Sequence, residues 1–387
     1  MPFKCVFMLL AEFVSFDSEI ATVFASILGD ISMTNITRTS ASHYEVQKNR
    51  RQQFIEDWRN NHRSVVHLKD IEMHRTARGL SSGVYLGKDG GNPVRTVDAA
   101  AHEIEPDTVS TIHRHSWDAV ILCIGGSGWI EIDQARIDWA AGDSIHVPAW
   151  SWHRHGNESG NIARFMSFSS EPFVDILGFA ILEDGGNTPL SQLPGYPGYT
   201  PTTPGNDIYA RRIRRLAADQ AEHRHGRLHT SWNDIEFRQS PRGTRTTFLL
   251  DSALGYRTSG LTMAMFEIGP GRAQSMHRHS GEAWLYVVEG HGHSFIGAEV
   301  DQGENYQWNK GDLIVVDHYS WHQHFNDDPT MTAKVVRVHI LDTLLNTMNA
   351  LCYPMNLLEE PPDHIRSKQT GDLSTISWPE VQRPSWP

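Results

Sequence analysis

Two groups of three histidines in this sequence have the residue type and the spacing of metal ligands. In the first group, a single residue separates His113 from His115, and His153 follows a Trp-Ser-Trp sequence. The segment around His113 has the composition of a β-strand, where side chains two residues apart share one face. Imidazole nitrogens bind divalent transition metals, and three converging imidazoles are difficult to satisfy in any other way. We therefore predict a three-histidine metal site inside a small β-barrel.

The same pattern occurs again later in the chain. His277 and His279 repeat the first H-x-H pair, and His322 repeats His153 at nearly the same displacement along the sequence. The preceding sequences also correspond, with HEIEPDTVSTIHRH in the first copy and FEIGPGRAQSMHRH in the second. Internal similarity at a fixed distance indicates a repeated structural unit. The chain is expected to contain two copies of one fold, each with its own metal site.

These motifs resemble those of the cupin superfamily, G-x5-H-x-H-x3-E-x6-G and G-x5-P-x-G-x2-H-x3-N. Besides the histidines, the matching positions are Gly126, Gly142, Pro148 and Asn157 in the first copy and Gly271, Gly290, Gly311 and Asn326 in the second. The resemblance implies a mainly β fold with two tandem jelly-roll barrels of the cupin type and connecting helices.

The glutamate of the first cupin motif is missing from both copies. The motif register places Ala119 and Ala283 at that position, and the nearest acidic residues, Asp118 and Glu282, come one residue early. A shift of one residue along a strand turns a side chain to the opposite face, so neither carboxylate should reach the metal without a bulge. We predict three histidine ligands and no carboxylate in each site.

Such a site suits an oxygen-dependent reaction on an aromatic acid. Fe(II) with three protein ligands keeps up to three coordination positions open, although imidazole sites also accept Mn, Ni, Co or Zn. Because no carboxylate neutralises the ion, an anionic chelating ligand is favoured. An ortho-hydroxy aromatic acid can occupy two positions and leave one for O2.

A second resemblance, within the cupins, agrees with this chemistry. The segments VPAWSWHRHGN and FSSEPFVDILGFAILED and the H-R-H-x-x-x-A sequences resemble the gentisate 1,2-dioxygenase group, which includes enzymes that cleave salicylate and 1-hydroxy-2-naphthoate. The resemblance implies a ring-cleaving dioxygenase of aromatic compound catabolism that uses Fe(II), a small aromatic acid and O2, and that assembles as a homotetramer. It places iron at least in the first barrel and leaves open whether one barrel or both are catalytic.

Strand alternation assigns the residues beside the ligands to faces. The positions expected to face inward, and to give an apolar lining suited to an aromatic ring, are Ala119, Ile121 and Cys123 in the first copy and Ala283, Leu285 and Val287 in the second. Arg114 and Arg278 should face outward and form salt bridges on the barrel wall. Next to the third ligand, His155 with Trp152 and His324 with Trp321 are candidate catalytic residues, with packing as the alternative.

The expected order of segments follows from the composition along the chain. We expect an N-terminal extension and helix (1–62), a first barrel (63–187), a Pro- and Gly-rich linker with a helix (188–227), a second barrel (228–345) and a C-terminal tail (346–387). Residues 1–32 differ from the rest, so either Met33 is the natural start or they form an amphipathic arm. A third H-R-H, His223–His225, lies in a helical pattern, where residues two apart do not share a face, and is expected on a surface helix.

Bulk properties exclude several classes of protein. A net charge of −12 over 387 residues argues against a nucleic-acid or anionic-membrane partner. The apolar run near the N-terminus is shorter than the roughly 18 residues needed to span a bilayer. Three widely spaced cysteines indicate neither a disulfide framework nor a zinc motif, which favours a reducing, cytoplasmic compartment.

Two other functions stay open at this point. A metal-dependent bicupin lyase, decarboxylase or isomerase would usually need a carboxylate at the metal, which the alanines at both positions disfavour. A non-catalytic bicupin that binds a small ligand would commonly have lost its histidines, whereas this sequence keeps six at the motif positions.

Overall fold

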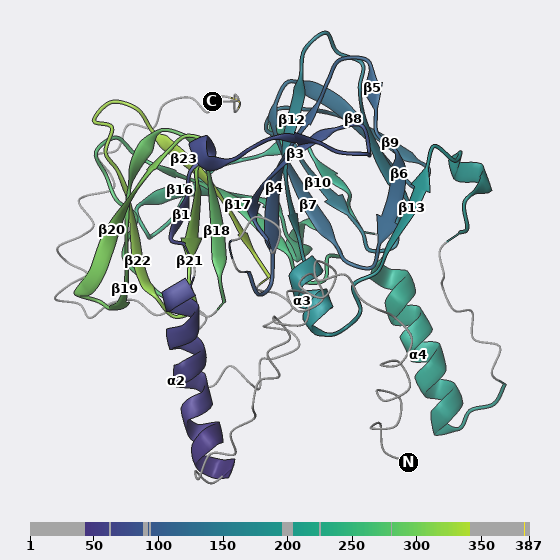
Figure 1. Cartoon of the computed structure of the whole chain (residues 1–387), viewed down its shortest axis with the longest axis horizontal. Helices are drawn as coiled ribbons and strands as arrows, with labels where there is room; N and C mark the ends of the chain where they lie inside the picture. The colour runs from purple at the N-terminus through teal and green to yellow at the C-terminus, as the bar shows by residue number, and fades with distance from the viewer. Residues whose placement is uncertain are drawn as a thin grey trace, which may run out of the picture. The chain divides into compact units, whose positions relative to one another are not determined.

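The computed structural model describes residues 43–61, 63–87, 92, 94–195, 204–223, 226–279, 281–340 and 383. These residues form two β-barrels in tandem, which confirms the predicted fold class (Figure 1). The expected helices are present as α2 (His43–Asn61) and α4 (Ile208–His223), and α3 (Glu171–Ile176) lies between two strands of the first barrel. The predictions for residues 1–32 and for the tail lie outside the described residues. No helix in the described segments is long and apolar enough to cross a membrane.

The first barrel consists of two facing sheets. One sheet has the order β14-β10-β7-β12-β4-β3-β2 and the other β13-β6-β11-β8-β9, with β5 paired to β11. The strands of the first sheet are β2 (His74–Arg75), β3 (Ser81–Leu86), β4 (Asp98–Ile104), β7 (Ala119–Gly125), β10 (Ser144–Val147), β12 (Ala163–Ser169) and β14 (His229–Thr230). Those of the second are β5 (Thr108–Val109), β6 (Ile112–His115), β8 (Ser127–Ile132), β9 (Ala135–Ala140), β11 (His153–Asn157) and β13 (Leu182–Gly186).

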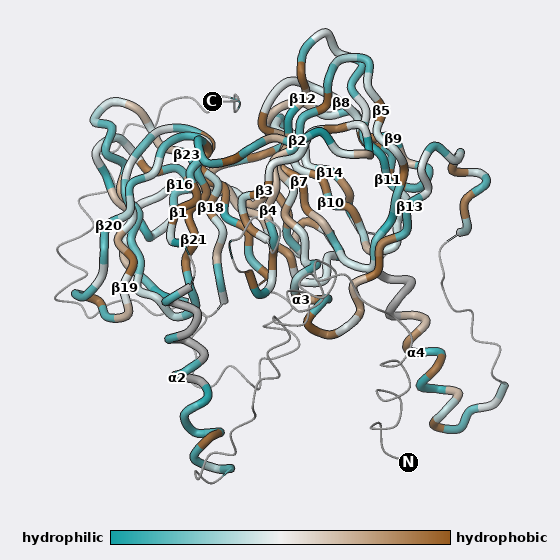
Figure 2. Tube along the Cα trace, in the orientation of Figure 1, coloured by the Kyte–Doolittle hydropathy of each residue, from teal (hydrophilic) through white to brown (hydrophobic). Residues whose placement is uncertain are grey.

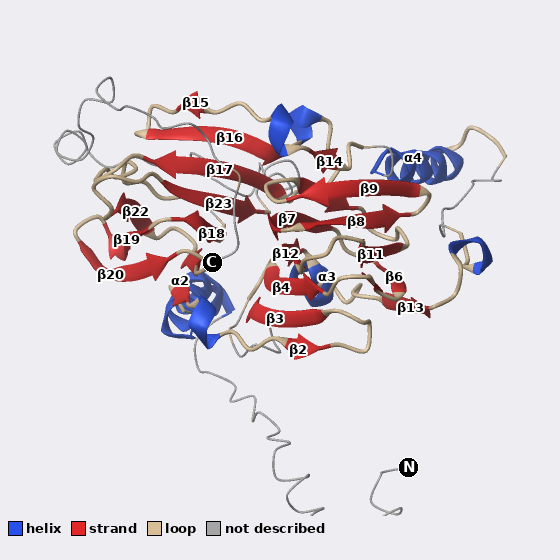
Figure 3. Cartoon of the chain, turned by 90° about the horizontal axis from the view of Figure 1, so that it is seen from above, coloured by secondary structure: helices blue, strands red, loops and turns tan. Residues whose placement is uncertain are grey.

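The second barrel repeats this plan, and Figure 3 shows the strands of the two barrels side by side. Its larger sheet has the order β1-β21-β18-β23-β17-β16-β15, and its smaller sheet the order β20-β19-β22. The strands of the larger sheet are β1 (Val65–Val66), β15 (Arg238–Gln239), β16 (Thr244–Leu250), β17 (Thr262–Ile268), β18 (Ala283–Glu289), β21 (Leu313–Val316) and β23 (Ala333–His339). Those of the smaller are β19 (His291–Glu299), β20 (Gln302–Asn309) and β22 (Trp321–Asn326).

Each barrel is completed by a short strand from the segment that leads into the other barrel. Strand β1 precedes the first barrel in sequence but pairs with β21 of the second, with Val65 opposite Ile314. Strand β14 precedes the second barrel but pairs with β10 of the first, with Thr230 opposite Ser144. The segments that begin at residues 63 and 228 therefore each start with a strand of the other barrel, and the predicted boundaries stay a prediction.

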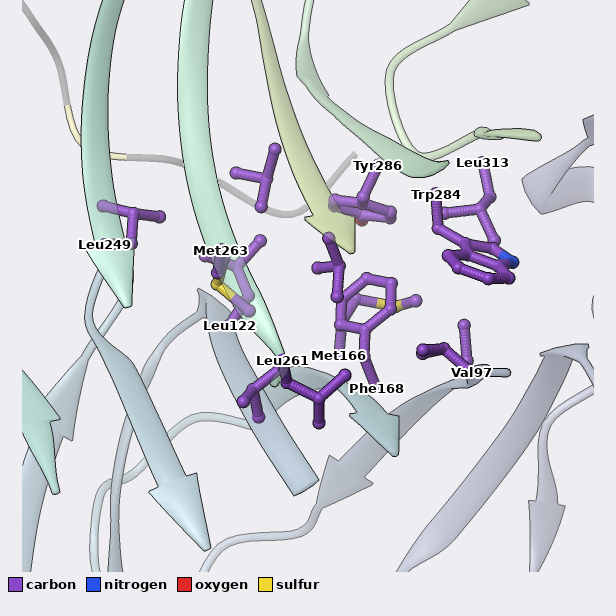
Figure 4. Packing of buried hydrophobic residues seen from close by; sticks show 14 of the residues in the cluster. Val97, Leu122, Met166, Phe168, Leu249, Leu261, Met263, Trp284, Tyr286 and Leu313 are labelled. Carbon is purple, nitrogen blue, oxygen red and sulfur yellow. The ribbon is translucent and has the colours of Figure 1, made fainter. Parts of the chain in front are cut away.

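The two barrels also share one hydrophobic core (Figure 4). On β7, Leu122 faces this shared core and Ile121 faces the interior of the first barrel. On β18, Tyr286 faces the shared core and Leu285 faces the interior of the second barrel. A strand buried on both faces needs a continuous apolar sequence, which explains the runs AVILCIG and AWLYVVE. The central strands of both barrels contain hydrophobic segments, whereas α2 is mainly hydrophilic (Figure 2).

Candidate metal centres

The first barrel brings its three predicted histidines together. One nitrogen of each of His113, His115 and His153 lies within 4.8 Å of the others, and all three side chains are buried. His113 and His115 share a face of β6, and His153 begins β11 directly opposite His113. The three histidines thus converge from two paired strands, β6 and β11, that are distant in sequence.

The second barrel forms the same group. One nitrogen of each of His277, His279 and His322 lies within 4.8 Å of the others, again in buried side chains. His277 and His322 form a bridge between neighbouring chain segments, as His113 and His153 do. Within the part of the chain that the structure describes, these are the two clusters with metal-ligand geometry. Helix α4 ends at His223, so this residue of the third H-R-H is helical, as predicted.

Hydrogen bonds to the backbone orient four of the six imidazoles. The Nδ1–H of His115 donates to the Trp117 carbonyl oxygen at 2.6 Å, and that of His153 to the Ser151 carbonyl oxygen at 3.0 Å. His277 and His322 each donate in the same way at 2.9 Å to the carbonyl oxygen two residues earlier. Because a carbonyl oxygen can only accept, each Nδ1 carries the proton and each Nε2 keeps its lone pair for a metal.

Burial keeps these imidazoles neutral. It lowers the pKa of His115 and of His322 to about 4, and that of His153 and His277 well below the ordinary value, where neighbouring histidines contribute further. Neutral imidazole is the form that binds a metal ion, so these four histidines need not lose a proton near neutral pH. The donor set, three neutral nitrogens without a carboxylate, fits Fe(II) and several other divalent transition metals.

Asp118 faces away from the first triad, as strand alternation predicts. Its carboxylate accepts hydrogen bonds from His146 Nε2 at 3.1 Å, from the Ala149 amide at 2.9 Å, and from the Ser259 amide at 2.6 Å. The Ser259 hydroxyl also donates to it. Because Ser259 belongs to the second half of the chain, Asp118 connects the two barrels and does not reach the metal.

Glu282 occupies the equivalent position in the second barrel and also faces the partner barrel. It accepts a hydrogen bond from the Thr96 hydroxyl at 2.7 Å. The motif's glutamate positions are filled by Ala119 and Ala283, which belong to the apolar clusters inside the two barrels. Both sites therefore lack the motif's carboxylate.

A cavity of about 240 Å³ contains the first triad. Its apolar lining residues are Leu80, Ala100, Trp117, Ala119, Ile121, Val147, Phe165 and Leu182. Its polar lining residues, besides the triad, are Arg78, Asp98, His102, His155, Ser167 and Ser169. Of the three residues predicted to face inward on β7, Ala119 and Ile121 line the cavity, and Cys123 is buried in the same interior cluster.

Arg78, which no motif in the sequence marks, also lies in this cavity. Its Nε and Nη2 atoms are buried without a hydrogen-bond partner, and burial lowers its pKa to about 10, so the guanidinium stays charged at neutral pH. Arg242 follows Arg78 at the same distance along the chain as His277 follows His113. The carbonyl oxygens of both arginines accept equivalent hydrogen bonds, from the amides of Thr111 and Ser275. A comparison of the two halves of the sequence could have found this pair.

Two further polar residues of the cavity also escaped prediction. Burial raises the pKa of Asp98 to about 6, although hydrogen bonds from Ser169 act in the opposite direction and lower it. His102 is held on both sides, because its Nδ1 lies 2.8 Å from the Ser82 hydroxyl and its Nε2 2.8 Å from the Ser167 hydroxyl. Asp98 therefore has the protonation range of an acid–base group, whereas His102 is fixed in place.

His155 and His324, predicted beside the third ligand, have different surroundings. His155 lines the cavity and stacks on Phe165, with ring centroids 4.7 Å apart. His324 Nδ1 lies 2.7 Å from the Ser294 hydroxyl, which accepts a hydrogen bond from Trp308 Nε1 at 3.0 Å. The environment of His155 is compatible with a role in substrate binding, while His324 belongs to a packed polar network.

The tryptophans before the third ligands each pack against an arginine of the barrel wall, and the catalytic role predicted for them stays a prediction. The ring of Trp152 stacks against Arg114, with the guanidinium 4.6 Å from the ring centroid, and Trp321 meets Arg278 in the same way at 4.7 Å. Arg114 also forms a 2.6 Å salt bridge with Glu183, as predicted for the barrel wall. Alternation continues through this segment, so the residue before an inward-facing histidine faces outward.

Comparisons with known proteins agree with this geometry. The Cupin domain family matches residues 101–169 and 264–339. The 5-aminosalicylate 1,2-dioxygenase of Comamonas sp. is 22% identical over 251 residues, 60% of this chain and 63% of that enzyme, so the chain spans less than two thirds of its length. The 1-hydroxy-2-naphthoate 1,2-dioxygenase of Nocardioides sp. (strain KP7) is 23% identical over 309 residues, 76% of this chain and 74% of that enzyme.

Solved structures show the same fold. A salicylate 1,2-dioxygenase from Pseudoaminobacter salicylatoxidans with gentisate bound has a TM-score of 0.52 at 16% identity, covering 88% of this chain and 94% of that one. An oxalate decarboxylase of Lactobacillus farciminis has a TM-score of 0.53 at 15% identity, covering 82% and 97%. At these identities the structures establish the fold alone. The chain thus contains two cupin domains, and its sequence is similar to those of ring-cleaving dioxygenases for aminosalicylate and hydroxynaphthoate.

Proposed function

We propose that the protein is an Fe(II)-dependent, ring-cleaving dioxygenase that acts on a small ortho-hydroxy aromatic acid with O2 in its first barrel. One observation carries this proposal: the 240 Å³ cavity combines three neutral imidazoles, a buried guanidinium and apolar walls. The relatives named for aminosalicylate and hydroxynaphthoate support the same class of substrate.

Each part of the cavity has a role in this proposal. His113, His115 and His153 would hold the ion, which supplies the redox chemistry that joins O2 to the ring. Arg78, with unpaired N–H groups, would bind the substrate carboxylate. Apolar side chains such as Ile121 would pack against the ring and exclude water.

Proton transfer in the cavity is proposed for Asp98. With a pKa of about 6, this carboxyl can accept a proton from a substrate hydroxyl and return it within one turnover near neutral pH. His155, buried and stacked on Phe165, would contribute a neutral imidazole to the same space. The homotetramer and the cytoplasmic location implied by the family resemblance stay predictions.

A metal-dependent lyase or decarboxylase is the second candidate. Asp98 favours it, because a carboxyl that lines the cavity could carry a proton in such a reaction. The engagement of Asp118 and Glu282 at the contact between the barrels disfavours it, since neither supplies a carboxylate ligand.

Metal analysis and O2 uptake distinguish these candidates. The iron-loaded protein would be assayed with gentisate, salicylate, 5-aminosalicylate, 1-hydroxy-2-naphthoate and a β-diketone. We expect O2 uptake and ring cleavage with a hydroxylated aromatic acid, and Arg78→Gln should raise KM at least tenfold with bound iron unchanged. Bound metal without O2 uptake on any of these compounds would favour the lyase. Absence of metal would favour a binding protein.

A further inference from the structure

The second barrel carries a further buried histidine beside its triad. Strand β23 pairs with β17 as β12 pairs with β4, in each case over seven residues in one continuous register. The seventh residue is Ser169 in the first barrel and His339 in the second. Because Ser169 lines the cavity that contains the first triad, His339 takes a position next to the second triad.

The side chain of His339 faces this triad. On β23, Ala333 and Val335 belong to the interior of the second barrel, and strand alternation places His339 on the same face. Its ring centroid is 5.0 Å from that of His279, whereas the centroids of His277 and His279 within the triad are 5.7 Å apart. The fourth imidazole is therefore as close to a triad member as the triad members are to one another.

Neither ring nitrogen of His339 has a hydrogen-bond partner, although the side chain is only 2% exposed. His324, another buried histidine near this triad, differs in this respect, because its Nδ1 lies 2.7 Å from the Ser294 hydroxyl. A buried polar group without a partner destabilises the fold, and a neutral imidazole can bind a metal ion through its free lone pair. Of the two additional histidines, His339 is thus the one available to a metal.

The position of the missing glutamate leaves space for this imidazole. The register of β18 with β23 places Trp284 opposite Val338, so Ala283 and His339 come together at the next step. Ala283 occupies the glutamate position of the first cupin motif. Because alanine is much smaller than glutamate, a ligand from the neighbouring strand can approach the metal where the motif's carboxylate would otherwise lie.

The triad itself is arranged around a cation. The Nε2 atoms of His277 and His322 lie 3.1 Å apart, and each Nδ1 carries the proton because it donates to a carbonyl oxygen. Two lone pairs therefore face each other, which is unfavourable unless a positive ion lies between them. Two nitrogens that bind one ion at about 2.1 Å each are roughly 3.0 to 3.4 Å apart, so the observed separation fits a shared metal ion.

We propose that His339 is a fourth metal ligand, so that the second barrel holds its ion with four histidines and the first barrel with three. The equivalent pair in the first barrel, Ala119 and Ser169, offers no fourth imidazole. A six-coordinate ion with four protein ligands keeps two open positions, whereas a chelating acid and O2 together need three. The second centre thus suits a structural role. Its separation from ring cleavage rests on the proposed function, but its ligand set does not.

Cobalt(II) binding to the full chain tests the ligand set. The background is His113→Ala, which empties the first centre and leaves one ion per chain in the second. In this background, His339→Phe keeps a ring but removes both nitrogens, and we expect it to weaken cobalt binding at least tenfold in competition with a chelator. The visible absorption of bound cobalt should also change, because the number of its nitrogen ligands falls from four to three.

The matched control is His324→Phe, which removes a buried imidazole of the same barrel that is hydrogen-bonded to Ser294. It should leave the affinity and the absorption of cobalt unchanged. His339→Ser, which installs the residue of the first barrel, should weaken binding as His339→Phe does, which shows that the loss is not due to the size of phenylalanine.

Four results would overturn the proposal. They are a background chain that binds no cobalt, an affinity of His339→Phe within tenfold of the background, an unchanged absorption spectrum in that variant, and an equal loss in His324→Phe. Each is distinguishable from failure of the proposed function, because cobalt binding is measured without iron, O2 or an aromatic acid.

Discussion

Asp118 and Glu282 occupy equivalent positions between the barrels, yet their surroundings predict opposite effects of neutralising them. Burial alone would raise the pKa of Asp118, but hydrogen bonds from His146, Ser259 and Ala149 outweigh it and give a pKa of about 2. Burial raises the pKa of Glu282 to about 7, because its Oε1 has no hydrogen-bond partner and Thr96 donates only to Oε2.

The size of each effect follows from these pKa values, at about 1.4 kcal/mol per pKa unit. Asp118 has its pKa lowered from 3.8 to about 2, so its charge stabilises the fold above the unfolded pKa by about 2 kcal/mol, and this is lost as pH falls through about 2. The pKa of Glu282 is raised from 4.5 to about 7. The protonated carboxyl group is therefore the form that the fold favours: stability is full below pH 4.5 and is lost as pH rises through 7, and the buried charge then lowers the free energy of unfolding by about 3 kcal/mol.

Urea unfolding of the isosteric variants at pH 8.5 and pH 4.5 measures both effects. At pH 8.5, Asp118→Asn should lower the free energy of unfolding by about 2 kcal/mol, and Glu282→Gln should raise it by up to about 3 kcal/mol. Near pH 4.5 the gain from Glu282→Gln should largely disappear, whereas most of the loss from Asp118→Asn should persist. If both variants change stability in the same direction at pH 8.5, the assignment of these carboxylates to different electrostatic environments is refuted.

Three further predictions concern the first cavity. His113→Ala should remove one metal ion per chain and leave the circular dichroism spectrum largely unchanged, since the barrel has its own apolar core; unchanged metal content would remove His113 from the ligand set. Ala119→Glu should keep the metal but abolish turnover by filling a coordination position, with Ala119→Gln as the control for size, and full activity in the glutamate variant would contradict an open three-histidine centre. Asp98→Asn should remove the acidic limb near pH 6 from the pH profile of kcat/KM, and an unchanged profile would exclude Asp98 as the proton carrier.

The duplication made much of the site predictable from sequence. Two copies of one histidine pattern at nearly constant spacing identified both triads, and strand alternation placed Asp118 on the far face from the metal. The same alternation would have placed Trp152 on the barrel wall, had it been applied through the loop before His153. Its catalytic assignment relied on proximity in sequence, which on a strand separates neighbouring side chains.

Other features had no local signal in the sequence. Strands β1 and β14 are two residues long, too short to show any periodicity, and their partners are set by contacts between distant segments. Arg78 stands alone in a turn before β3, without a motif around it. The structure places Arg78 in the cavity of the first triad, and in the sequence only the repeated spacing to Arg242 could have indicated that position.

The exchange of β1 and β14 between the barrels imposes an order on synthesis and folding. Val65 leaves the ribosome before any strand of the first barrel, but its partner Ile314 lies in the second barrel and is among the last strand residues to be made. At 5–20 residues per second, the delay between the two is roughly 12 to 50 s. During that time the first barrel can be completed by β14, whereas β1 has no partner because β21 has not yet been synthesised. A chain cut between residues 187 and 228 would leave β10 and β21 each without the strand that covers its edge, and unpaired edges promote aggregation. The two barrels are thus expected to fold completely only as parts of one chain, and neither is expected to be stable when expressed alone.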